Sequence, residues 1–184
     1  NDKNVKYFNY LDKNKFYKQI KYLKENYEII DPLNKEKYLK KKNKKLCWLT
    51  FDDGYIDHYH NVLPILNKFN LKGSFFPVIK TLKTNKVLNV NKIQALVNTI
   101  DNQKLLNFIE ERYNKKYRSK TDFKIILKNL ILKNKKKRRF DKRNTILIKI
   151  LLQKYLNKTF RNNLIDLLFK KFISNNSLNN KNIY

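Results

Sequence analysis

One stretch of the sequence constrains the fold more than any other. Residues 46–51 form an apolar run of strand length, which is typical of a strand buried on both faces. A helical pattern of apolar residues follows over 61–70, and a second strand-like run covers 73–79. The only two glycines of the chain, Gly54 and Gly73, lie at the turns. This order of strand, helix and strand predicts two adjacent parallel strands.

The helix expected between these strands contains Pro64. A helix tolerates proline in its first turn, where the missing N–H has no partner to lose. We therefore expect the helix to begin close to this residue, with Asn61 as its N-cap.

Most of the remaining chain has helical periodicity. A helix is expected over 13–27, and a short strand over 28–30 that ends at Asp31-Pro32. Residues 89–173 are expected to form helices that pack mainly on one another, over 91–99, 101–113, 121–133, 143–157 and 160–173, with Asp101 and Thr121 as N-caps. The Asn-rich residues 174–184 have no periodicity and are expected to fray.

The chain is strongly basic. Lys and Arg number 43 against 15 Asp and Glu, for a formal net charge of +28 over 184 residues. Such an excess usually indicates a nucleic acid or an anionic membrane surface as the partner. However, Lys, Asn, Ile, Phe and Tyr dominate the composition, and all have AT-rich codons, so genome composition also explains much of the charge. The basic residues are spread along the chain, which favours this second explanation.

Several classes of protein are excluded. One cysteine, Cys47, cannot form an intramolecular disulfide framework or a multi-cysteine zinc site. No run of about 18 apolar residues is present, so no transmembrane helix is expected. The sequence begins at Asn1 with neither an initiator Met nor an apolar signal segment, so its N-terminus is expected to be incomplete. The compartment is therefore left open, with a cytoplasmic location slightly favoured.

Two adjacent carboxylates, Asp52 and Asp53, follow the first buried strand. The carboxyl ends of parallel strands are where α/β proteins place ligands. Two like charges this close favour a bound cation, which one carboxylate holds while the other stays free as a base. A solvated Asp-Asp-Gly turn explains the same residues without any chemistry. The pentapeptide alone does not decide between the two interpretations.

The wider pattern resembles the polysaccharide deacetylase family, which carries the nodulation-type (NodB) homology domain. Its first motif, Thr-Phe-Asp-Asp-Gly, is present at 50–54. The resemblance is close over 46–79, and it includes TFDDGY at 50–55, DHY at 57–59, NVLPIL at 61–66 and KGSFFP at 72–77.

The resemblance implies a fold and a domain organisation. The fold is α/β: an incomplete distorted (β/α) barrel with a helix-rich segment after the second barrel strand. Residues 1–88 would be the N-terminal part of the deacetylase domain, 89–173 a helical insertion, and 174–184 a polar tail.

The resemblance also implies a reaction, the metal-assisted hydrolysis of N-acetyl or O-acetyl groups on a carbohydrate. Asp52 would be the general base, and Asp53 a ligand of a divalent metal, usually zinc. A metal lowers the pKa of bound water, and a nearby carboxylate can then take its proton.

Part of the family pattern is missing. The second motif, His-Ser/Thr-x-x-His, is absent, and the only two histidines, His58 and His60, directly follow the first motif. The chain is therefore interpreted as a fragment of a deacetylase, inactive by itself. A degenerate relative, or a non-catalytic basic protein that binds nucleic acid or an anionic glycan, is the alternative.

Four further residues near the motif are interpreted one by one. His58 and His60 are interpreted as structural, with a metal role as the alternative. Cys47 is expected to be a small buried hydrophobe. Trp48 is expected to lie in the core or the barrel wall, with sugar stacking as the alternative.

Overall fold

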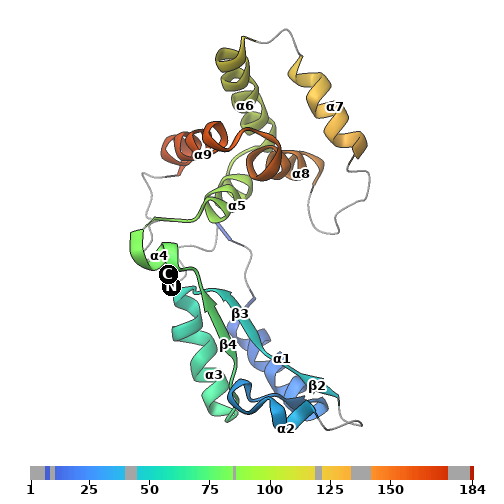
Figure 1. The fold of residues 1–184 in the computed structure, drawn as a ribbon, viewed down its shortest axis with the longest axis vertical. Helices are drawn as coiled ribbons and strands as arrows, with labels where there is room; N and C mark the ends of the chain where they lie inside the picture. Colours follow the sequence, from blue (N-terminus) through green and yellow to red (C-terminus); the bar gives the residue numbers. More distant parts are fainter. Residues whose placement is uncertain are drawn as a thin grey trace. The chain divides into compact units, whose positions relative to one another are not determined.

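The computed structural model of the chain describes residues 7–8, 11–39, 45–84, 86–118, 122–133, 142–173 and 183–184. The chain divides into two units (Figure 1). One, called here the strand unit, comprises 9–86 and 179–184. The second, called the helical unit, comprises 1–8 and 87–178.

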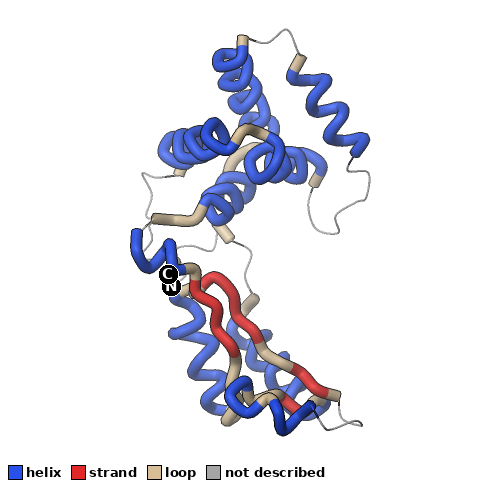
Figure 2. The backbone as a smooth tube through the Cα atoms, viewed as in Figure 1, coloured by secondary structure: helices blue, strands red, loops and turns tan. Residues whose placement is uncertain are grey.

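The strand unit alternates short strands with helices (Figure 2). Its first helix, α1, begins after Asp12, whose carboxylate accepts hydrogen bonds from the backbone N–H groups of Asn14 and Lys15. The elements in chain order are α1 (Lys13–Asn26), β1 (Glu28–Ile29), a 3₁₀ turn (Pro32–Asn34), α2 (Glu36–Leu39), β2 (Leu46–Cys47), β3 (Thr50–Asp53), a π-helical turn (His58–Val62), α3 (Leu63–Lys68), β4 (Ser74–Pro77) and α4 (Ile79–Thr84).

The strands form two parallel pairs, β1 with β2 and β3 with β4. In the second pair Thr50 lies opposite Ser74 and Asp53 opposite Pro77, with α3 in the connection. The predicted parallel strand–helix–strand unit is thus confirmed. The expected single strand over 46–51 is wrong in its bounds, because residues 46–47 pair with β1 while the β3 pairing begins at Thr50.

The prediction that the first strand is buried on both faces is also wrong. Thr50 and Asp52 are exposed while Phe51 and Asp53 are half-buried, which is the alternation of a strand with one covered face. Each sheet has two strands within the described residues, and the barrel implied by the resemblance is not confirmed. The fold that the structure shows is mixed α/β, mostly helical, with two small parallel sheets.

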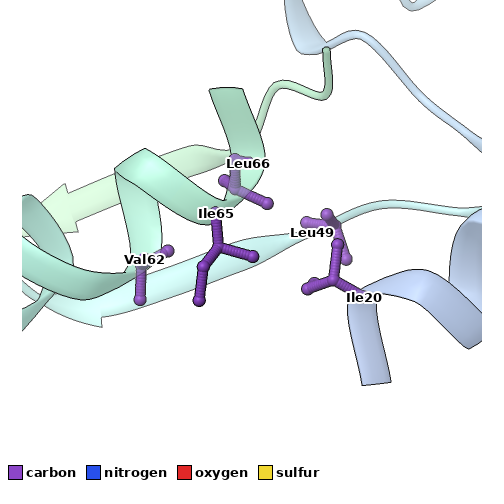
Figure 3. Close-up of a cluster of buried hydrophobic side chains, with 5 residues drawn as sticks. All are labelled: Ile20, Leu49, Val62, Ile65 and Leu66. Atoms are coloured by element: carbon purple, nitrogen blue, oxygen red, sulfur yellow. The ribbon is translucent and has the colours of Figure 1, made fainter. Parts of the chain in front are cut away.

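The core of the strand unit lies between α1, α3 and the segment that enters β3 (Figure 3). Five buried side chains form it: Ile20, Leu49, Val62, Ile65 and Leu66. The α3 residues in this cluster come from the predicted helix over 61–70, and Pro64 lies in its first turn as expected. The predicted Asn61 cap is wrong: this residue lies inside the π-helical turn, and its side-chain amide donates to the Asp57 carboxylate.

The helical unit contains five α-helices within its described residues, and no strand lies between 89 and 173 there. The predicted helices are confirmed, except that 143–157 divides into α8 and a π-helical turn. Asp101 caps α6 through the backbone N–H of Lys104, whereas Thr121 lies outside the described residues. The bounds are α5 (Asn89–Thr99), α6 (Asn102–Tyr117), α7 (Phe123–Lys133), α8 (Arg143–Ile150), the π turn (Leu151–Tyr155) and α9 (Lys158–Phe172).

The five helices bury an apolar core of their own. Ile93, Leu96, Ile109, Ile148 and Leu168 are each 1% exposed or less. Polar contacts also join helices that are distant in sequence: Lys92 pairs with Asp166, and Asn102 donates to the hydroxyl of Thr145 over 2.9 Å. Within the described part of the chain, no helix is long and apolar enough to cross a membrane.

Candidate active site

Asp52 and Asp53 occupy the carboxyl end of β3. Asp52 is exposed, whereas Asp53 is half-buried, because successive strand residues point to opposite faces. The strand ends at Asp53 itself, whose φ of 71° lies in the left-handed region, and Gly54 follows with a φ of 67°. The turn thus begins one residue earlier than the glycine alone would indicate.

Gly54 allows the two strands to approach closely at this end of the sheet. A Cβ atom on Gly54 would lie 2.7 Å from Cβ and 2.9 Å from Cα of Pro77, the last residue of β4. Contacts this short do not occur in folded proteins, so a side chain at residue 54 would push the two strand ends apart. The glycine therefore fixes the backbone that carries the two carboxylates.

Tyr55 holds the Asp53 carboxylate. Its hydroxyl donates to Oδ2 of Asp53 over 3.1 Å. The Tyr55 ring lies nearly parallel to the ring of Tyr184, with centroids 5.8 Å apart.

The last two residues of the chain are packed against this turn. The N–H of Ile56 donates to the carbonyl of Ile183 over 2.8 Å, and the Ile183 side chain is 4% exposed. The expected fraying is wrong for residues 183–184, and residues 174–182 lie outside the described part of the chain.

His58 lies among aromatic rings beside this turn. Its ring centroid is 5.7 Å from Phe51, 5.6 Å from Tyr55 and 5.8 Å from Phe75. Burial lowers the pKa of His58, against the opposing effect of the Asp57, Asp53 and Asp52 carboxylates. A neutral imidazole packed in this way is consistent with the structural interpretation of His58.

The other residues singled out in the sequence lie around the same two strands. Trp48 is 46% exposed, so its prediction as a core residue is wrong; its Nε1 donates to Oγ of Ser74 over 3.0 Å. Cys47 is half-buried against the core rather than fully buried. His60 is exposed, and its ring packs edge-on against Tyr59.

Comparison with known proteins identifies the segment that carries this site. Residues 39–112 match the family model described as polysaccharide deacetylase. The resemblance drawn from the sequence is therefore confirmed. We call residues 39–112, which match this family model, the deacetylase segment.

The Bacillus subtilis (strain 168) protein named "Putative polysaccharide deacetylase YxkH" is 34% identical to the chain over 74 residues. The matched residues are 38% of this chain and 26% of that protein, so the chain spans about a quarter of the length of this relative. No solved structure matches the chain significantly.

The deacetylase segment contains Asp52, Asp53 and both histidines. It extends well beyond residues 46–79, through α5 and into α6. The elements that position the two carboxylates, β3, α3 and β4, lie wholly within it.

The segment does not by itself present a complete metal site. Across the described ranges, no three His, Cys, Asp or Glu side chains come close enough together to hold one ion. A zinc site needs three or four protein ligands. The donor set therefore does not fit a tight zinc site, and metal binding by Asp53 stays a prediction.

Sequence reasoning missed the side chains that support the two carboxylates. Tyr55 directly follows the motif, but nothing in the spacing indicates that its hydroxyl turns back onto Asp53. Tyr184 lies 129 residues further along the chain, within the segment 174–184 that has no periodicity. No local signal therefore placed it against Tyr55.

Proposed function

We propose that the chain is part of a metal-dependent polysaccharide deacetylase that removes N-acetyl or O-acetyl groups from a carbohydrate. One observation carries the proposal: within a segment that matches this family, Asp52 is exposed at the carboxyl end of a parallel strand. A base must reach its substrate, and this strand end is where α/β proteins bind ligands.

Asp52 is the general base of the proposed reaction. Its carboxylate takes a proton from a water molecule as the water oxygen bonds to the acyl carbon of the acetyl group. The bond from that carbon to the sugar nitrogen or oxygen then breaks as the leaving atom takes up the proton held by Asp52, which releases acetate and a sugar amine or hydroxyl and restores the carboxylate. Proton transfer by a positioned side chain accelerates such reactions by about 10²–10⁴-fold.

Asp53 supplies one ligand to a divalent metal in this proposal, and zinc is the metal that the family resemblance favours. Tyr55 fixes the carboxylate for this role through its hydrogen bond to Oδ2. In the family that the sequence resembles, the remaining ligands are the histidines of the His-Ser/Thr-x-x-His motif, which the 184 residues do not contain. The 184 residues alone are therefore expected to be inactive.

The proposal is tested by acetate release from two substrates, an N-acetylated chito-oligosaccharide and O-acetylated xylan. The full-length product of the gene is assayed with added zinc and with a chelator, beside the 184-residue chain. The expected result is zinc-dependent acetate release by the full-length product and none by the 184 residues. Absence of release from both substrates by the zinc-loaded full-length product would overturn the proposal.

A further inference from the structure

Three cationic side chains converge on one pair of aromatic rings in the helical unit. The rings of Phe108 on α6 and Phe172 on α9 meet edge to face with centroids 5.9 Å apart. Nζ of Lys171 lies 4.5 Å from the Phe108 centroid and 5.5 Å from that of Phe172. Cζ of Arg112 lies 5.0 Å from Phe108, and Nζ of Lys104 lies 5.5 Å from Phe172. We call Lys104, Arg112 and Lys171 the cation cluster.

No carboxylate neutralises the cation cluster in the part of the chain that the structure describes. Asp166, the only acidic residue of α9, pairs instead with Lys92. The Nε atom of Arg112 is buried and has no hydrogen-bond acceptor among the described residues. Buried donors are nearly always paired, so this one calls for an acceptor. The cluster is a focused positive site, unlike the spread charge expected from the sequence.

The aromatic rings prepare the cluster for an anion. A cation over a ring face is held in place by the ring quadrupole, which reduces the conformational freedom lost when a ligand binds. Three like charges around one ring pair also repel one another, and an anion between them removes that repulsion. The site thus favours a ligand that carries several negative charges.

We propose that the cation cluster binds the acidic groups of an anionic polysaccharide. A nucleic acid is less well suited, because single strands bind through base stacking on open aromatic faces. Here Phe108 is 8% exposed and the rings carry the cations. The choice of a carbohydrate rests on the proposed deacetylase function, and it would make an acidic glycan the substrate class of that enzyme.

The test measures direct binding of the whole chain to a heparin oligosaccharide and to a single-stranded DNA oligonucleotide of similar charge. Both are titrated in about 0.15 M salt, where long-range attraction is screened. Lys104→Gln/Arg112→Gln/Lys171→Gln removes the cluster. Lys124→Gln/Lys128→Gln/Lys133→Gln on α7 removes the same charge elsewhere in the unit and is the matched control. The double variant Lys104→Gln/Lys171→Gln changes only exposed side chains. It takes the place of the triple variant in the binding assay if the triple variant fails to fold.

The cluster variants are expected to lose heparin affinity at least tenfold and the α7 control less than threefold. Equal losses in the two sets would overturn the proposal, because they would show diffuse attraction to the net charge. A tenfold loss for DNA without a loss for heparin would also overturn it, in favour of a nucleic-acid site. The assay needs no catalysis, so failure of heparin binding and failure of acetate release are separate results.

Discussion

The hydroxyl of Tyr55 donates a hydrogen bond to Oδ2 of Asp53, over 3.1 Å. Asp53 has a left-handed backbone conformation, which costs conformational energy for any residue except glycine. The hydrogen bond and the packing of Tyr184 on the Tyr55 ring offset part of that cost. The turn that carries the proposed metal ligand is therefore maintained by residues outside the motif.

Tyr55→Phe is expected to lower the free energy of unfolding by about 1 to 2 kcal/mol, because it removes a partly buried hydrogen bond to a charged group while keeping the ring. The measurement is urea denaturation followed by Trp48 fluorescence. Tyr59→Phe is the matched control, since Tyr59 is 67% exposed, and its loss should be below about 0.5 kcal/mol. Equal changes in the two variants would show that the Tyr55 hydroxyl contributes nothing to this turn.

Gly54→Ala is expected to destabilise the strand unit by about 1 to 3 kcal/mol, since it adds a left-handed non-glycine residue and a contact with Pro77. Asn70→Ala separates the two effects: Asn70 has a φ of 52° but is exposed and already carries a Cβ atom. The alanine at residue 70 should cost about 1 kcal/mol or less. If thermal denaturation gives the two variants the same stability, the close approach to Pro77 is not important.

Stability should depend on pH through His58. Burial places the folded-state pKa of His58 below its ordinary value of about 6.5, so the unfolded chain binds a proton that the folded chain resists. The free energy of unfolding therefore falls as the pH drops below about 6.5, and it levels off below the folded-state pKa. Urea midpoints between pH 7.5 and 5.5 measure this slope.

The matched pair His58→Gln and His60→Gln assigns that slope to one residue. His58→Gln should flatten the dependence on pH, whereas His60→Gln should leave it, because His60 is exposed. A slope that survives His58→Gln and disappears in His60→Gln would contradict the burial argument.

Local patterns predicted the strand–helix–strand unit because its signals lie within about 30 residues. Pro64 marked the first turn of α3, and Asp101 marked the start of α6. What the sequence did not predict depends on pairing between distant segments. The apolar run at 46–51 divides because its first two residues pair with β1, and Trp48 is exposed because no described layer covers it. The contact of Tyr184 with Tyr55 has the same cause, since no local rule relates residues so far apart.

The roles of Asp52 and Asp53 came from the family motif rather than from geometry. The structure places both at the end of β3 and adds the support of Tyr55, but no side chain among the described residues identifies Asp52 as a base. Chemical evidence on Asp52 itself is therefore needed.

The most direct test is the rate of acetate release by the full-length gene product carrying Asp52→Asn, with zinc in excess. Asparagine keeps the size of the side chain but cannot accept the proton, so kcat should fall by about 10²–10⁴-fold. Asp12→Asn is the control, because asparagine caps a helix as well as aspartate does, and it should leave kcat unchanged. Undiminished kcat in Asp52→Asn would contradict the assignment of Asp52 as the base.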